Sequence, residues 1–359
     1  SCSSRLQTSG WPRSRCIGLS KAIMRGTYKP HETRPVDIPK QSGNETRRLK
    51  LGVIGDRMAA KALLNALTPY WEQIFLNGSW GFRPARSCMQ MLADLEATMV
   101  RTGNFVIAID DIRNAFDNVP IEPTITAHEQ LLTSTLALNG TKADDIAKLL
   151  TLIETVLRGH NQQRTKGIDQ GNPYSPTALN VLLQSIHDSP LHDSGTLWYR
   201  YADNLVYLSH SEDEGQKILG SVREYLGRVN MTLKGEPGTA IDLTEGQHAD
   251  ILGTRVRLEE GRLEYSFGSD AWTKLDLCLA KAWETPKSQE SALAGVGGWG
   301  DSYGMTFESG GDPRRQVLEH ASEFGFREFN PRDLEERWRA SCERWRECRR
   351  KAFQQHGIE

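Results

Sequence analysis

The sequence has few cysteines and no long apolar run. Its 359 residues include six cysteines, and no two of them form a C-x-x-C pair. This spacing argues against a zinc ribbon or a disulfide framework and favours a reducing, cytoplasmic setting. No stretch of about 18 apolar residues occurs, so we expect no membrane partner. The first residues lack the apolar core of a secretory signal. HExxH, Walker and GxGxxG motifs are absent, which excludes the enzyme classes that those motifs define.

Charge is small overall but unevenly spread. The formal net charge is −2, which by itself does not favour nucleic acid. Between Lys21 and Lys61, however, ten basic residues face four acidic ones, a local excess of +6 (ten minus four). Such an excess can hold phosphates even on a nearly neutral protein. A solvated basic face is the other interpretation.

Hydrophobic periodicity predicts an α+β fold around an antiparallel sheet. Residues 1–60 are basic, broken by Pro and Gly, and are interpreted as short strands and loops. The predicted helices cover 57–75, 87–100, most of 121–158, the end of 167–186, 211–229, and 270–359 with a Gly-rich break at 294–311. The predicted strands cover 104–112, a hairpin at 198–209, 249–257 and 262–266.

Two carboxylates stand at the ends of buried strands. Asp111 ends the run "VIAID", and Asp203 lies at the tip of the hairpin "WYRYADNLVYLS". Asp203 and Asn204 are ordinary turn residues on local grounds, because both types tolerate tight turns. If the two strands are neighbours, the carboxylates converge, and such a pair needs a cation between them. Mg²⁺ fits oxygen ligands of this kind and leaves positions for phosphates. Asp110 should point to the opposite side of its strand.

Several blocks in order resemble reverse transcriptases of the bacterial group II intron and retron type. The blocks are "RPVDIPKQSGNETRRLKL" from residue 34, "SWGFRPARSCMQML" from 79, "DIRNAFDNV" from 111, "GIDQGNPYSPTALN" from 167, "RYADN" from 200, "ILG" from 251 and "GGWGDSYG" from 297. The resemblance implies a right-hand polymerase fold, with N-terminally short fingers at 1–100, a palm at 101–266 and a helical thumb or maturase-like region at 267–359. It implies an RNA-directed DNA polymerase acting on an RNA template, a DNA or RNA primer and deoxynucleoside triphosphates.

The same resemblance assigns roles to individual residues. Asp111 and Asp203 would be catalytic and would bind two Mg²⁺ ions, with Mn²⁺ as a substitute and the carbonyl of Ile112 as a further ligand. Asn204 would be a weaker, neutral metal ligand. The residues assigned to the incoming nucleotide are Lys40 and Arg47 on its triphosphate, Phe116 under its sugar, and Gln170 and Gly171 along its pocket. Simple surface charge for Lys40 and Arg47, and simple core packing for Phe116, are the alternatives.

The sequence departs from the family pattern near these residues. Asn204 replaces the second Asp of the Tyr-Ala-Asp-Asp box, which removes a charge from the metal site. Polymerases of negative-strand RNA viruses are similar in having Gly-Asp-Asn there. Asp169 stands where the family has Pro, so we expect a negative charge near the triphosphate. Lys234 is the candidate substitute for the lost Lys of the palm's Lys-Thr motif. An active polymerase with altered metal preference, an inactive maturase-like RNA-binding protein and an anti-phage defence reverse transcriptase all remain open, as does the oligomeric state.

Overall fold

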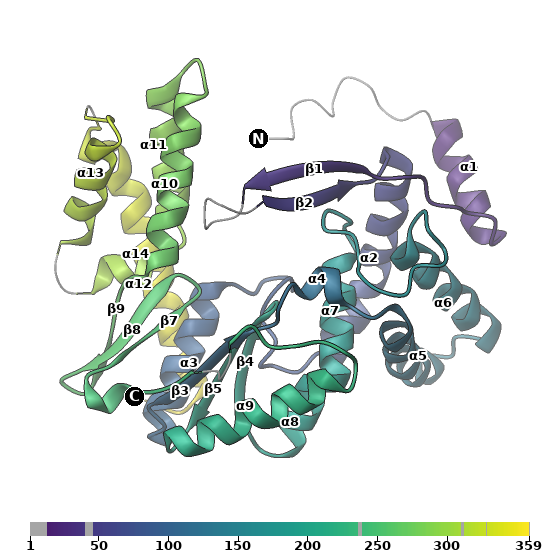
Figure 1. Ribbon diagram of the computed structural model, residues 1–359, viewed down its shortest axis with the longest axis horizontal. Helices are drawn as coiled ribbons and strands as arrows, with labels where there is room; N and C mark the ends of the chain where they lie inside the picture. The colour runs from purple at the N-terminus through teal and green to yellow at the C-terminus, as the bar shows by residue number, and fades with distance from the viewer. Residues whose placement is uncertain (1–12, 40–45, 236–238, 310–311, 328, 359) are drawn as a thin grey trace.

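The computed structural model describes residues 13–39, 46–235, 239–309, 312–327 and 329–358, with helices and antiparallel sheets along one chain (Figure 1). The helices are α1 (Arg13–Met24), α2 (Ile54–Ile74), α3 (Cys88–Thr102), α4 (Ala115–Asn118), α5 (Ile121–Leu138), α6 (Ala143–Arg158), α7 (Ser175–Leu183), the π-helical turn η1 (Gln184–Asp188), α8 (Ser189–Asp193), α9 (Glu212–Gly227), α10 (Ser269–Trp283), α11 (Ser288–Gly300), α12 (Gly304–Glu308), α13 (Pro313–Glu323) and α14 (Pro331–Gln355). The predicted α+β character is confirmed.

A four-stranded antiparallel sheet forms the centre of the molecule (Figure 1). Its spatial order is β4-β5-β3-β6, with β3 (Val106–Asp111), β4 (Leu197–Tyr201), β5 (Asn204–Ser209) and β6 (Thr239–Asp242). The apolar run of β3 lies between β5 and β6, and its side chains are hydrophobic on both faces because a core packs against each side of the sheet. The predicted hairpin is the pair β4–β5, and it lies directly beside β3.

Alternate residues of this sheet face two different cores. Ala108 and Leu205 belong to a core that includes residues of α7 and α9. Ile107 and Val206 belong to a second core that includes the apolar face of α3. This period of two is the expected geometry of a strand. The central sheet is therefore covered on both faces, and the ends of its strands are the places where polar side chains reach solvent.

A two-stranded hairpin precedes the central sheet in the sequence. It pairs β1 (Arg34–Pro39) with β2 (Thr46–Leu51), and Ile38 lies opposite Arg47. Figure 1 shows this hairpin on the same side of the central sheet as α4, with α1 and α2 next to it. The predicted short strands of this region are confirmed. Helix α1 was missed, because its apolar residues are few and none of its residues is buried.

A second antiparallel sheet and the last helices form the C-terminal part. The sheet has the order β7-β8-β9, with β7 (His248–Ile251), β8 (Thr254–Glu259) and β9 (Arg262–Phe267). Helix α14 lies against α3, where the Arg349 Nε donates to Glu96 Oε1 at 3.0 Å. The Tyr265 hydroxyl of β9 donates to the other oxygen of Glu96 at 2.9 Å. Glu96 thus joins three elements that are far apart in the sequence.

Two sequence predictions for this part were wrong. The strand predicted at 249–257 is a hairpin, because Leu252 and Gly253 have φ angles of 53° and 85° and form the turn between β7 and β8. The Gly-rich break predicted at 294–311 is mostly helix. A Cβ at Gly300 would lie 2.7 Å from Trp338 Nε1 of α14, so this glycine permits close helix packing. Strand β6 was also missed, since its four residues "TAID" show no clear alternation.

Two further expectations concern thiols and membranes. The cysteines in the described part are all free thiols, at positions 16, 88, 278, 342 and 348. None of the helices in the described ranges combines the length and apolar character needed to cross a bilayer.

Candidate active site

The predicted carboxylates meet at one edge of the central sheet. Asp111 is the last residue of β3 and lies opposite Asn204, the first residue of β5. The amide of Ile112 donates to the carbonyl of Asp203 at 3.0 Å, so the pairing continues into the hairpin turn. The carbonyl of Ile112 points to the same side of its strand as the amide, because both backbone groups of a strand residue face the same neighbouring strand. The structure therefore brings Asp111, Asp203 and Asn204 together.

The pKa of Asp111 reports how the two charges interact. Burial is the largest cause and the negative charge of Asp203 the second, and together they raise this pKa from its usual value to about 6. The ammonium of Lys234, 3.8 Å from the Asp111 carboxylate, lowers it in part. Two ionised carboxylates at this edge of the sheet repel each other, and a bound cation would offset that repulsion.

Oxygen ligands at this edge fit a hard divalent cation. Two carboxylates and the amide oxygen of Asn204 are the ligand types that Mg²⁺ and Mn²⁺ accept. Within the described residues no cluster of three or more His, Cys, Asp or Glu side chains forms a complete metal site. A cation here would take its other ligands from backbone oxygen, water and the phosphates of a substrate.

Asp110 lies on the buried side of the strand, as predicted. It is 7% exposed, and its Oδ1 accepts the amides of Asp111 and Gly235, each at 2.8 Å. Its role is to hold the segment around Lys234, whose own amide donates to the carbonyl of Asp111 at 2.7 Å. Sequence analysis singled out Lys234 only as a candidate, and the structure places it beside Asp111.

A buried ionic network supports the hairpin that displays Asp203. Arg200 of β4 is fully buried and binds both oxygens of Asp188, at 3.0 and 2.6 Å. It also donates to the carbonyl of Ala202 at 3.1 Å, which fixes the turn beside Asp203. Burial alone would raise the pKa of Asp188, but the charge of Arg200 and hydrogen bonds from His187 and Arg200 lower it to about 2. This network was not predicted from the sequence, where its signal is an arginine inside the apolar and aromatic strand "LWYRY".

A second turn packs tightly against the same hairpin. A Cβ at Gly81 would lie 2.2 Å from the amide nitrogen of Ala202, so only glycine allows this approach. The carbonyl of Gly81 accepts from Asn180 at 2.9 Å. Ala202 itself has φ 59°, in the left-handed region that favours glycine. The hairpin tip is thus held in a single, strained conformation by its neighbours.

The residues predicted to contact a nucleotide lie on neighbouring segments. The carbonyl of Phe116 accepts the amide of Ile168 at 2.9 Å, which joins α4 to the loop containing Gln170. The carbonyl of Gln170 accepts the amide of Lys50 of β2 at 2.8 Å. Gly171 has φ 109°, and a Cβ there would lie 3.2 Å from the carbonyl of Lys50. The structure therefore brings Phe116, Gln170 and Gly171 close to the β1–β2 hairpin.

The two predicted triphosphate ligands are described only in part. Arg47 lies on β2, three residues before Lys50. Lys40 lies outside the described residues. The position of Arg47 on β2 is compatible with the predicted clamp, which stays a prediction.

Asp169 does not present a free negative charge, contrary to expectation. It is 6% exposed, and its Oδ1 lies 2.7 Å from Arg164 and 3.3 Å from Lys50. These two cations neutralise the carboxylate. Asp169 therefore ties β2 to the Gln170 loop instead of repelling a triphosphate.

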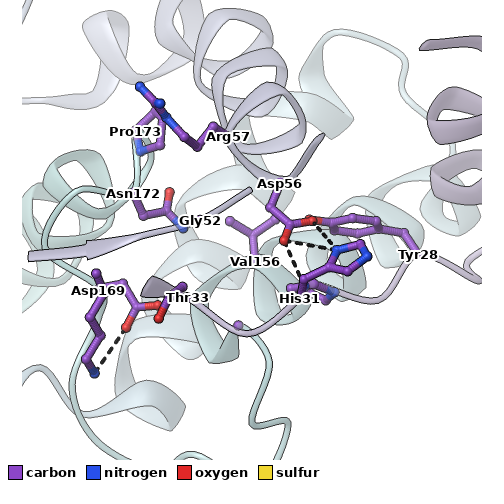
Figure 2. A pocket seen from close by; sticks show the side chains of 13 residues that line it. Tyr28, His31, Thr33, Gly52, Asp56, Arg57, Val156, Asp169, Asn172 and Pro173 are labelled. Carbon is purple, nitrogen blue, oxygen red and sulfur yellow. Dashed lines mark hydrogen bonds and ion pairs between the residues drawn. The ribbon is translucent and has the colours of Figure 1, made fainter. Parts of the chain in front are cut away.

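A small cavity lies beside this ion pair (Figure 2). Asp56 accepts from the Tyr28 hydroxyl at 3.0 Å and from the amide of His31 at 2.8 Å, which closes one wall. Asp169 and Asn172 form the opposite wall in Figure 2. The space is about 30 Å³, enough for water and far too small for a nucleotide. The ion pair and hydrogen bonds of its lining connect the loop of Asp169 to the N-terminal elements.

Comparison with known proteins agrees with this geometry. Residues 38–236 match the family described as reverse transcriptase (RNA-dependent DNA polymerase). This match covers more than half of the chain and includes Asp111, Asp203 and Gln170. The chain therefore belongs to the reverse transcriptase family.

Several curated proteins are similar to part of this chain. Protein YkfC of Escherichia coli (strain K12) is 30% identical over 185 residues, 49% of this chain and 45% of that protein. The group II intron-encoded protein LtrA of Lactococcus lactis is 27% identical over 183 residues, 49% of this chain and 28% of that protein. An uncharacterized 91 kDa protein in a cob intron of Schizosaccharomyces pombe is 28% identical over 161 residues, 43% of this chain and 18% of that protein. The matches thus span less than half of each of these relatives.

Proposed function

We propose that the protein is an RNA-directed DNA polymerase that works by two-metal nucleotidyl transfer. The observation that carries the proposal is the meeting of Asp111 and Asp203 at one sheet edge, where each carboxylate disfavours the other's charge. Divalent cations bound there would supply charge neutralisation for the primer hydroxyl and the transferring phosphoryl group. Membership of the reverse transcriptase family supports the choice of RNA as template and deoxynucleotides as substrates.

The remaining roles follow the arrangement of the elements. The central sheet with Asp111 and Asp203 is the palm, the β1–β2 hairpin with α2 belongs to the fingers, and the helices after β9 form the thumb. Lys40 and Arg47 hold the triphosphate, and Phe116 lies under the sugar and disfavours a 2′-hydroxyl. Gln170 and Gly171 line the pocket beside β2, where their backbone already contacts Lys50. A primer of DNA or RNA, Mg²⁺ with Mn²⁺ as a substitute, and a cytoplasmic location complete the proposal.

One observation favours a second function. Asn204 faces Asp111 with a neutral amide, so the metal edge has one charge fewer than the Tyr-Ala-Asp-Asp pattern provides. A maturase-like RNA-binding protein without chemistry is consistent with this loss. A defence-type reverse transcriptase would use the same catalytic edge and differs only in its biological role.

Primer extension on a primed RNA template tests the proposal. The protein should extend the primer with deoxynucleotides in Mg²⁺ or Mn²⁺, and Asp111→Asn should reduce the rate by at least about 1000-fold because the metal edge loses a charge. Salt-sensitive RNA binding should be equal in both proteins, since Asp111 contacts metal and not the RNA backbone. RNA binding without extension in either metal would favour the maturase-like function instead.

A further inference from the structure

Phe82 is an aromatic side chain that the fold holds exposed next to the proposed catalytic edge. It is 54% exposed, and its φ of 59° lies in the left-handed region, where a bulky residue is uncommon. Its ring meets that of Phe116 edge-on, with centroids 6.3 Å apart. An exposed aromatic residue in a strained backbone conformation indicates a function beyond packing.

The turn that carries Phe82 is fixed on both sides. Before it, Gly81 packs against Ala202 of the catalytic hairpin and accepts a hydrogen bond from Asn180. After it, the buried guanidinium of Arg83 donates to the carbonyls of Leu76 and Ser79, at 2.8 and 2.9 Å. These contacts determine the backbone without help from the Phe82 ring. The ring is therefore free to serve a ligand.

Phe82 also lines a groove of about 500 Å³, a size in the range of sites that hold small organic groups. The lining comes from successive turns of α2, from the Phe82 turn and from Thr177 of α7. Its lining includes apolar and neutral polar side chains: Leu64, Asn65, Thr68, Trp71, Phe75 and Phe82. Trp71 and Phe75 are buried, so the exposed ring of Phe82 is the stacking surface among these lining residues, and Asn65 and Thr68 add hydrogen-bonding groups beside it.

The charge of the groove is suited to a phosphate backbone. Arg83 and Glu72 neutralise each other through an ion pair at 3.1 Å. Lys61 lines the mouth and makes no ion pair or hydrogen bond with any residue in the described ranges. An unpaired cation next to aromatic surface is the combination that binds single-stranded nucleic acid.

We infer that this groove takes an unpaired nucleobase of the template strand, stacked on Phe82, next to the position where the incoming nucleotide meets Phe116. The inference rests on the proposed polymerase function. The position of the groove indicates which part of the substrate it would bind. Its Phe82 ring contacts Phe116, and the neighbouring Gly81 packs against Ala202, one residue before Asp203. A template must present its next base at that point, and Phe82 gives this base a fixed surface.

Photocrosslinking of a primed RNA template tests the inference. The template contains 5-iodouracil at its first unpaired position, and the crosslinked residue is identified by mass spectrometry. The wild-type protein should crosslink at Phe82, and Phe82→Tyr should retain the crosslink because its ring can stack. Phe82→Asn should lower the crosslink yield and weaken template binding by about tenfold, the effect of one lost stacking contact.

The Asn variant also separates function from folding. Asn tolerates the left-handed conformation better than Phe, so the melting temperature of Phe82→Asn should be unchanged or higher. Leu138→Asn is the matched control, since Leu138 is 89% exposed at the end of α5. This variant should leave crosslinking unchanged.

Two further outcomes have different meanings. An equal crosslink in folded Phe82→Asn, or a crosslink mapped only to other residues, would overturn the inference while primer extension by the wild-type protein still supports the polymerase. Absence of primed-template binding by the wild-type protein would overturn both.

Discussion

Asn204 determines how much negative charge surrounds a bound cation. It lies opposite Asp111 in the β3–β5 pairing, and its Nδ2 makes only a long contact of 3.4 Å with the carbonyl of Tyr201. The side chain is therefore free to turn its oxygen toward a metal. An amide oxygen binds Mg²⁺ more weakly than a carboxylate does, because the ligand carries no charge.

Replacing Asn204 with Asp should restore that charge. We expect the Mg²⁺ concentration for half-maximal primer extension to fall roughly tenfold, the effect of about 1.4 kcal/mol of added attraction at this range. The measurement is a Mg²⁺ titration of extension rate, with Asn230→Asp in a turn away from the site as control. Extension that stays undetectable in Asn204→Asp would favour the non-catalytic protein.

The pKa of Asp111 predicts a pH dependence. The metal binds the deprotonated carboxylate, and this pKa is raised to about 6 by burial and by Asp203. Metal affinity should therefore be full above pH 7 and fall as the pH drops through about 6. Calorimetric titration of Mn²⁺ between pH 5 and 8 measures this change.

Lys234→Met provides the comparison for that titration. It removes the cation that lowers the Asp111 pKa, so the midpoint of the pH dependence should move upward. A midpoint below pH 5 in the wild-type protein, or no movement in the variant, would contradict the assigned electrostatics.

Hydrophobic patterning predicted most single elements but few of the contacts between them. The strand of "VIAID" and the hairpin at 198–209 were predicted correctly because a short run of apolar and aromatic residues is a local signal. The network of Asp188 and Arg200 was not predictable, since its members come from different elements. The glycines of α11 led to a wrong prediction for the same reason: Gly297 packs against Arg337 and Gly300 against Trp338, and both partners lie on another helix.

Helix η1 and strand β4 depend on one buried ion pair. Removing Asp188 leaves the fully buried guanidinium of Arg200 without its anion, which costs about 3–5 kcal/mol of stability in comparable sites. We therefore expect Asp188→Ala to lower the free energy of unfolding by about that amount, measured by urea denaturation. Glu224→Ala breaks the exposed ion pair with Arg228 at the end of α9 and should change the free energy of unfolding by less than about 1 kcal/mol. Similar losses in both variants would contradict this ranking.

At the scale of the whole molecule, positive charge gathers near the N-terminal elements. No acidic residue occurs between Arg13 and His31, and α1 has no buried residue. In Figure 1, α1 lies next to α2, far from α9 at the opposite side of the molecule. Three residues of the local excess predicted from the sequence, Lys21, Arg25 and Lys29, are exposed in this region, where they can meet RNA phosphates.

Removing four of these charges should make RNA binding less salt-dependent. With Arg13, Arg15, Lys21 and Arg25 changed to Gln, the slope of log K against log salt should decrease by up to about 3 for single-stranded RNA. Filter binding at several salt concentrations measures it. Lys217→Gln with Arg223→Gln, at two exposed positions of α9, removes charge from another surface as the control and should leave the slope unchanged. Equal slopes in all proteins would place the RNA elsewhere.

The contact between α14 and α3 also affects how the chain folds during its synthesis. Arg349 binds Glu96 across 253 positions of sequence, and Trp345 and Ala352 complete the core around the methionines of α3. While the ribosome makes the intervening segments, that apolar surface of α3 has no cover and is open to chaperones or to aggregation. The final helix therefore completes a core whose first members left the ribosome much earlier.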